Sequence, residues 1–273
     1  MMGPRVALRG AAVSDVGPHR AVNQDAAFTA SWGAAVADGV GGGPAGDLAS
    51  AAFIHRLAAG MPGPLEPELL AVRVREANWD LRAHVERDPA LHGMATTFTG
   101  IFLSDAEELL LAHTGDSRAY LLRDGLLSRQ TRDDSLVQVL VDSGLMTAEV
   151  AASHPRRNVI TASLSGAERD AATVAVHVPR IGDRWLLCSD GLTDYVPEAD
   201  IERLLVAYDA AEDAAGACVA LAIEAGTYDN VTVVVCDVAL GAPMNPTGDL
   251  AHRPSTSFYG AAAARFMEGL ESA

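Results

Sequence analysis

The sequence predicts an α+β fold in which strands and helices are stacked in layers. Short links join neighbouring apolar runs at 104–108 and 123–125, and links of this length are typical of hairpins, whose strands pair antiparallel. The helical segments come in pairs between groups of strands and do not alternate strictly with them. This grouping is typical of an α+β layered sandwich.

Each element is predicted from its apolar pattern. Alternating or β-branched runs predict strands at 6–13, 34–37, 96–103, 109–113, 119–123, 173–178, 185–188 and 231–238. Apolar residues at helical spacing predict helices at 48–59, 65–86, 135–143, 199–206 and 210–225. The sequence contains no internal repeat and no linker rich in proline, glycine or serine before residue 240.

The composition changes after Val238, where glycine, proline, serine and threonine become frequent. We therefore expect one domain over 1–239 and a flexible C-terminal tail over 240–273. Phe266, Met267 and Leu270 lie at helical spacing within that tail, so the alternative is a short helix that docks on the domain or on a partner.

The charge balance excludes several classes of function. The 273 residues include 36 acidic and 20 basic side chains, which gives a formal charge of −16 and argues against sequence-independent binding of nucleic acid. All 20 basic residues are arginine. Without lysine, the chain cannot form the lysine-bearing phosphate loop, a Schiff base or the lysine-dependent kinase site.

The cysteines and the apolar runs predict the cellular compartment of the protein. Cys188, Cys218 and Cys236 are odd in number and lack C-x-x-C spacing, which is typical of buried thiols in a reducing compartment. No apolar run approaches the ~20 residues that cross a bilayer. We expect a cytoplasmic protein that binds neither a membrane nor nucleic acid and is a monomer.

Aspartates recur where predicted strands end, beside glycine or a small polar residue. The four cases are Asp38 before Gly39, Asp116 after Gly115, Asp190 before Gly191 and Asp229 before Asn230; Asp25 ends a fifth segment, 20–25. Each segment alone is typical of an ordinary turn. If the carboxylates converge, they repel one another unless a divalent cation neutralises them. Hard oxygen ligands of this kind suit Mg²⁺ or Mn²⁺.

The order of these segments resembles the metal-dependent protein phosphatases, the type-2C or PPM class of serine/threonine phosphatases, and the bacterial branch in particular. The matching motifs are Ser14-Asp15-Val16-Gly17, Arg20-x-x-Asn23-Gln24-Asp25, Asp38-Gly39-Val40-Gly41-Gly42, Gly115-Asp116-Ser117-Arg118, Ser189-Asp190-Gly191-Leu192 and Asp229-Asn230-Val231-Thr232. They span 13–238, which is nearly the whole predicted domain.

The resemblance implies a four-layer α-β-β-α sandwich of two antiparallel sheets flanked by helix pairs, with metal ions at one edge. In that family the residue at Asp38 bridges two Mn²⁺ or Mg²⁺ ions, and the carbonyl at Gly39 joins the second. The aspartates matching Asp190 and Asp229 complete the first site. Asp116 with Asp190 matches the pair that holds a weaker third ion in bacterial members.

The remaining matches imply the chemistry. Asp25 matches a family residue that orients metal-bound water. Arg20 matches the family arginine that binds the substrate phosphate, whose oxygens its planar guanidinium can meet in pairs. A water activated by both ions attacks phosphorus, so the resemblance implies hydrolysis of phosphoserine and phosphothreonine on proteins with no phosphoenzyme.

Two features depart from the family pattern, and a third lies in a segment that varies within the family. Val40 stands where animal relatives carry a histidine, so it cannot protonate the leaving group. In Asp133-Asp134-Ser135, the residue before the serine is Asp134, where bacterial relatives usually show a histidine, and we assign this departure no role. Residues 144–165 match the variable flap beside the active site, where Arg156 and Arg157 are candidates to meet an acidic phosphopeptide.

The expected partners are phosphorylated proteins and, by resemblance, a serine/threonine kinase and its substrates. The alternative is a catalytically silent relative that binds phosphoproteins as an interaction module. A phosphatase specialised for anti-sigma-antagonist phosphoproteins is a third reading, against which Arg20 counts, since such relatives usually lack the phosphate-binding arginine.

Overall fold

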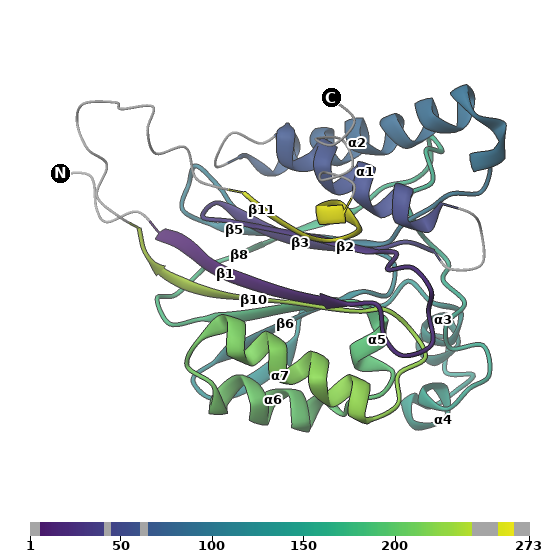
Figure 1. The fold of residues 1–273 in the computed structure, drawn as a ribbon. Coiled ribbons are helices and arrows are strands. Elements are labelled where there is room, and N and C mark those ends of the chain that lie inside the picture. The colour runs from purple at the N-terminus through teal and green to yellow at the C-terminus, as the bar shows by residue number, and fades with distance from the viewer. Residues whose placement is uncertain (1–5, 41–44, 61–64, 242–255, 265–273) are drawn as a thin grey trace, which may run out of the picture.

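The computed structural model describes residues 6–40, 45–60, 65–241 and 256–264, and its elements form four layers (Figure 1). Two β-sheets lie face to face in the middle. Helices α1 (Gly46–Ala59) and α2 (Pro67–Arg87) cover the outer face of one sheet, and α6 (Glu198–Ala207) and α7 (Ala211–Glu224) cover the outer face of the other. The predicted α-β-β-α sandwich is therefore confirmed.

All strand pairs in both sheets are antiparallel among the described residues. One sheet has the order β1-β10-β9-β6-β7 and the other the order β11-β2-β3-β4-β5-β8. The strand bounds are Val6–Asp15 (β1), Asp25–Ala30 (β2), Gly33–Asp38 (β3), Phe98–Leu103 (β4), Leu109–Thr114 (β5), Arg118–Arg123 (β6), Leu126–Arg129 (β7), Thr173–His177 (β8), Arg184–Cys188 (β9), Val231–Leu240 (β10) and Ser257–Gly260 (β11). Below, these are called the β10 sheet and the β3 sheet.

Three apolar layers separate the four structural layers. The central strands are buried on both faces, and so they read as nearly continuous apolar runs. Along β10, Val233 and Val235 face α7, whereas Val234 and Cys236 face the opposite sheet. Side chains that alternate along each strand thus pack the two sheets against each other. The loops at one end of the sandwich lie outside these apolar layers and can contain polar residues.

The smaller elements lie mostly at the end of the sandwich that carries the acidic turns. Helices α3 (Leu136–Asp142) and α4 (Ala148–Ala152) lie beside the connections between the sheets, and α5 (Asp190–Thr193) directly follows β9 (Figure 1). A 3₁₀ turn, Pro89–Leu91, follows α2. Helix α4 lies within the segment predicted as a flap, 144–165.

The sequence patterns predicted eight strands and five helices that correspond to β1, β3–β6, β8–β10 and α1–α3, α6 and α7, with ends shifted by a few residues. They missed β2, β7, β11, α4 and α5. Strand β2 is rich in alanine, which has low strand propensity, and β7 alternates exposed with half-buried side chains at a sheet edge. The missed strands form because neighbouring strands pair with them.

The prediction of a flexible tail over 240–273 is wrong for one stretch. Strand β11, Ser257–Gly260, pairs with β2, and a helical turn over 261–264 follows it. Ala261 and Ala262 are buried in the apolar layer beneath α1. Phe266, Met267 and Leu270, for which a docked helix was the alternative, lie outside the described residues.

Two further predictions concern the cysteines and membrane-spanning segments. All three cysteines lie in the described part of the chain and are free, buried thiols. Within the described ranges, no helix combines the length and the apolar character that crossing a bilayer requires.

Candidate metal centre

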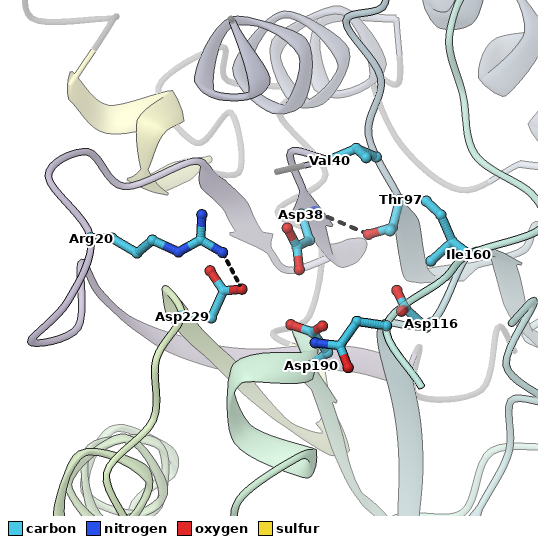
Figure 2. Close-up of a pocket in the computed structure, with 9 residues that line it drawn as sticks. Arg20, Asp38, Val40, Thr97, Asp116, Ile160, Asp190 and Asp229 are labelled. Carbon is cyan, nitrogen blue, oxygen red and sulfur yellow. Dashed lines mark hydrogen bonds and ion pairs between the residues drawn. The ribbon is translucent and has the colours of Figure 1, made fainter. Parts of the chain in front are cut away.

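Four of the predicted aspartates and Arg20 line one cavity of about 140 Å³ at the edge where the two sheets meet (Figure 2). They reach it from separate elements: Asp38 ends β3, Asp190 begins α5, Asp229 precedes β10, and Asp116 lies in the turn between β5 and β6. The full lining is Arg20, Asp38, Val40, Thr97, Asp116, Asn158, Ile160, Asp190 and Asp229. The acidic strand ends therefore converge on one cavity.

Asp38 is held by backbone hydrogen bonds to the strand that follows it. Its backbone N–H donates to Thr97 Oγ1 at 3.1 Å, and its carbonyl accepts from the N–H of Thr97 at 2.8 Å. The Thr97 hydroxyl is in turn 2.7 Å from Ser117 Oγ. The antiparallel register places Asp25 of β2 directly opposite Asp38. This register fixes two carboxylates side by side at one end of the β3 sheet.

Asp190 is carried to the cavity by the turn between β9 and α5. Its neighbour Ser189 donates from Oγ to Asp25 Oδ2 at 2.7 Å and accepts from the Thr232 N–H at 3.0 Å. The Ser189 hydroxyl therefore links a carboxylate of the β3 sheet to two strands of the β10 sheet. This contact holds the two sheets in register at the edge where the cavity opens.

Burial and mutual repulsion make these carboxylates unfavourable as bare anions. Burial, followed by the charges of Asp25 and Asp190, raises the pKa of Asp38 well above its ordinary range. The pKa of Asp190 is raised for the same reasons, with Asp116 the largest charge facing it. Burial raises the pKa of Asp25 to about 6 and that of Asp116 to about 7.

Two observations fit a divalent cation at this place. Asp25 Oδ1 and Asp190 Oδ1 are buried and have no hydrogen-bond partner among the described residues, which is costly unless a further group binds there. The donor set consists of carboxylate oxygens, which Mg²⁺ and Mn²⁺ prefer. In the described residues, however, no three acidic, histidine or cysteine side chains are already grouped around one ion position. Ion binding therefore requires the carboxylates to draw together or water to complete the ligand set.

Arg20 extends from the loop before β2 towards Asp229 (Figure 2). Its Nη2 donates to Asp229 Oδ2 at 2.7 Å, and its Nε donates to the carbonyl of Tyr228 at 3.3 Å. The loop itself is tied to the β10 sheet by Asn230. The Asn230 side chain accepts from the N–H of Gln24 at 2.9 Å and donates to the carbonyl of Val16 at 2.8 Å.

Two of the predicted ligand and positioning residues lie beside the cavity without lining it. Gly39 follows Asp38 and approaches α1 so closely that a Cβ atom would lie 2.2 Å from the carbonyl oxygen of Gly46, so only glycine fits. Asp25 is only 1% exposed and lies opposite Asp38 on the neighbouring strand.

The two flap arginines also lie outside the lining. Arg157 donates from Nε to Asp194 Oδ2 at 3.0 Å, and Arg156 is exposed. Two other residues of the same segment, Asn158 and Ile160, do line the cavity. Sequence reasoning missed both of them, and it missed Thr97, because none of the three carries a charge or lies in a glycine-containing turn.

Asp133, to which the sequence assigned no role, is the centre of a buried ion cluster next to Asp116. It is 7% exposed, accepts from Arg118 Nη2 at 2.8 Å and from Arg118 Nε, and forms a second ion pair with Arg129. Its charge is the largest electrostatic contribution raising the pKa of Asp116. The following residue, Asp134, accepts from the N–H of Gly115 at 3.0 Å. This pair of acids therefore fixes the turn that carries Asp116.

Comparison with known proteins identifies the family. A family model described as protein phosphatase 2C matches residues 19–223. The serine/threonine protein phosphatase PstP of Mycobacterium tuberculosis (strain CDC 1551 / Oshkosh) is 45% identical over 234 residues, which cover 85% of this chain and 45% of that protein. The chain thus spans about half the length of this relative.

Solved structures agree with that match. A crystal structure of the Mycobacterium tuberculosis serine/threonine phosphatase PstP/Ppp has a TM-score of 0.81 and 44% identity, covering 85% of this chain and 99% of that one. The catalytic domain of PstP in complex with two manganese ions has a TM-score of 0.79 and 42% identity, covering 86% and 99%. The chain belongs to the protein phosphatase 2C family, the PPM class that its ordered acidic motifs predicted.

Proposed function

We propose that this chain hydrolyses phosphoserine and phosphothreonine on proteins, using two Mn²⁺ or Mg²⁺ ions held in the acidic cavity and forming no phosphoenzyme. The observation that carries the proposal is that one cavity is lined by Arg20 and four aspartates drawn from both sheets. The name of the relative PstP and the two manganese ions in its solved catalytic domain support the same reaction class.

The residues divide into those that would hold the ions and those that would hold the substrate. Asp38, with the carbonyl of Gly39, and the pair Asp190 and Asp229 would hold the two ions, and Asp116 with Asp190 would hold a weaker third. When bound, two divalent cations lower the pKa of water so that it attacks phosphorus at neutral pH, and they neutralise charge on the phosphoryl group. Together with Arg20, the two cations would place positive charge where the phosphate dianion binds.

Arg20 would bind the phosphoryl oxygens. Its guanidinium lies at the cavity and is already paired with Asp229, so it is oriented before substrate arrives. A planar guanidinium matches two phosphate oxygens at once, which a single ammonium group cannot do. Asp25, buried opposite Asp38, would accept a hydrogen bond from water through its unpartnered Oδ1.

The lining supports direct attack by water. Among the described residues it contains no cysteine, serine or histidine, and the Thr97 hydroxyl is engaged by the Asp38 N–H and by Ser117. Val40 lines the cavity and has no proton to give. We therefore assign protonation of the leaving seryl or threonyl oxygen to water.

The substrates in this proposal are phosphoproteins, and the opposing enzyme is a serine/threonine kinase. We place the reaction in the cytoplasm. Three free buried thiols support a reducing compartment.

The test is release of inorganic phosphate from a phosphothreonine peptide, with Mn²⁺ and after chelation. We expect activity only with the metal. Asp38→Asn keeps the shape of the side chain but removes its charge, so kcat/KM should fall at least about a hundredfold, which corresponds to about 3 kcal/mol. The matched control is Asp105→Asn, since Asp105 is exposed in the turn between β4 and β5 and should leave the rate unchanged.

Two results would contradict the proposal. Equal rates for the parent and Asp38→Asn would remove the metal centre from the reaction. Metal-independent binding of the phosphopeptide without release of phosphate would instead identify a silent interaction module.

A further inference from the structure

Strand β11 lies outside the 19–223 stretch that matches the family, yet it is an integral part of the β3 sheet. It pairs antiparallel with β2 from Ser257 opposite Thr29 to Gly260 opposite Ala26. Without it, β2 would be the edge strand of that sheet, and edge strands fray most readily at their ends. The end in question is Asp25, the first residue of β2.

The segment is anchored on both sides of the strand. The ring of Phe258 lies 4.3 Å from the ring of His55 on α1, and His55 Nε2 is 2.8 Å from the carbonyl oxygen of Ala262. Ala262 is completely buried and Ala261 nearly so. The segment 257–262 therefore fills part of the apolar layer beneath α1 and is not a loosely attached tail.

Gly260 brings this segment into direct contact with the acidic site. Its φ is +61°, and a Cβ atom at this position would lie 2.2 Å from the carbonyl oxygen of Asp25 and 2.7 Å from Ser14 Oγ. Ser14 Oγ accepts from Asn23 Nδ2 at 2.8 Å, and Asn23 Oδ1 accepts from the N–H of Asp25 at 3.1 Å. The contact continues into the loop that carries Arg20, because Asn23 belongs to that loop.

We propose that the segment 257–262 positions Asp25 and the Arg20 loop for cation binding. The packing of Gly260 on the Asp25 backbone keeps Asp25 opposite Asp38 on the neighbouring strand, beside the acidic cavity. Loosening or displacing the segment lets the start of β2 move and weakens the hold on the ions. This inference rests on the metal-dependent function proposed above and adds a part of the chain that the family match does not include.

The experiment compares two glycine variants that carry the same backbone strain. Gly260→Ala places a Cβ against Asp25, whereas Gly125→Ala, in the turn between β6 and β7 with φ of +79°, places its Cβ where no atom lies within 4 Å. Both substitutions destabilise the fold because alanine is less stable than glycine in the left-handed conformation. Only the first disturbs Asp25. The measured quantities are Mn²⁺ affinity by titration calorimetry and hydrogen exchange of the amides in 23–30.

We expect Gly260→Ala to weaken Mn²⁺ binding about tenfold, as loss of support around ligands commonly does, and to lose protection at the start of β2. Its activity should recover at saturating Mn²⁺. Gly125→Ala should lose only the stability that a left-handed alanine costs and should keep parental Mn²⁺ affinity. Phe258→Ala, which loosens the same segment without adding a Cβ, should act in the same direction and covers the case in which Gly260→Ala fails to fold.

Unchanged Mn²⁺ affinity and exchange in both Gly260→Ala and Phe258→Ala would overturn the positioning role. Equal weakening in Gly125→Ala would also overturn it, because a general loss of stability would then explain the effect. If the parent chain binds Mn²⁺ and the variants behave as expected but the parent releases no phosphate, the proposed hydrolysis fails while the positioning role stands.

Discussion

Arg20 and Asp229 form an ion pair at the cavity, with Arg20 Nη2 2.7 Å from Asp229 Oδ2. The two residues are 209 positions apart in the chain and belong to the loop before β2 and the turn before β10. Both side chains remain partly exposed, so solvent screens the pair and its contribution to stability is small. Its importance for the proposed function is geometric, because it holds the Arg20 guanidinium at the cavity.

Replacement of Arg20 by lysine tests this geometry. Lysine keeps the charge but lacks the fork, and a charge-assisted hydrogen bond is worth about 1.5–3 kcal/mol, so kcat/KM for a phosphothreonine peptide should fall about 10- to 150-fold. Most of the loss should lie in KM. Arg9→Lys on the exposed face of β1 is the control. An unchanged KM in Arg20→Lys would remove Arg20 from substrate binding.

Asp133 should matter for stability more than its sequence context suggests. It lies between Arg118 and Arg129, and Asp133→Asn leaves both guanidinium groups without their counter-charge in a largely buried place. We expect a loss of about 3 kcal/mol in the free energy of unfolding by urea, with the m-value unchanged. Glu86→Gln, which breaks an exposed pair with Arg82, should change it by less than about 0.5 kcal/mol. Equal small effects would contradict the buried-cluster interpretation.

Asp133 also illustrates what the sequence could and could not predict. The aspartates at 38, 116, 190 and 229 were predictable because each ends an apolar strand beside a turn residue, and their order along the chain resembles one family. The role of Asp133 depends on arginines that β6 and β7 bring to it, and no local pattern encodes that pairing. Ile160 could not be predicted either, because only the folded chain brings it to the cavity and no local pattern marks it.

The strands that were missed have a related cause. Strand β2 contains three alanines in six residues, and β11 follows a segment rich in glycine, proline, serine and threonine, so neither has a strong local strand signal. Each exists because a partner strand and a helix cover it. Strand propensity identified β1 and β8 as well as most of the central strands, whereas tertiary packing decided β2 and β11, the part of the sheet where Asp25 lies.

His113 should make the unfolding free energy depend on pH. Burial lowers its pKa below the ordinary value of 6.5, and its ring lies between Thr99 Oγ1 at 2.9 Å and the carbonyl oxygen of Arg132 at 3.0 Å. The unfolded chain then binds a proton more readily than the folded chain. Protonation therefore favours the unfolded chain, and the free energy of unfolding decreases as pH falls from about 6.5 towards the lower pKa of folded His113. Above that range His113 does not make the free energy of unfolding depend on pH.

The measurement is urea unfolding of the parent and of His113→Gln between pH 5 and 8. The parent should lose more stability than the variant below pH 6.5, and the two curves should run parallel above pH 7. His177, whose pKa burial also lowers, remains in both proteins and so cancels from the comparison. Parallel curves over the whole range would show that His113 titrates alike in the folded and unfolded chains.

The acidic cavity should destabilise the metal-free chain, and removing one charge should relieve it. Asp38 is held by β3 opposite Asp25 and faces Asp190, and burial together with these charges raises its pKa. Asp38→Asn removes the charge without changing the shape, so the metal-free variant should be more stable than the metal-free parent at neutral pH, where the raised pKa of Asp38 makes its charged form unfavourable.

With Mn²⁺ bound, the parent should instead be more stable than Asp38→Asn. An ion that binds only the folded state stabilises it by about 2.7 kcal/mol at a hundred times its dissociation constant, and the parent should gain this while Asp38→Asn gains little. The crossing of the two melting temperatures, measured by calorimetry with chelator and with Mn²⁺, separates a metal centre from an ordinary acidic turn. If Asp38→Asn were less stable than the parent in chelator, the Asp38 carboxylate would be satisfied by the protein alone, and the cavity would have no electrostatic need for a cation.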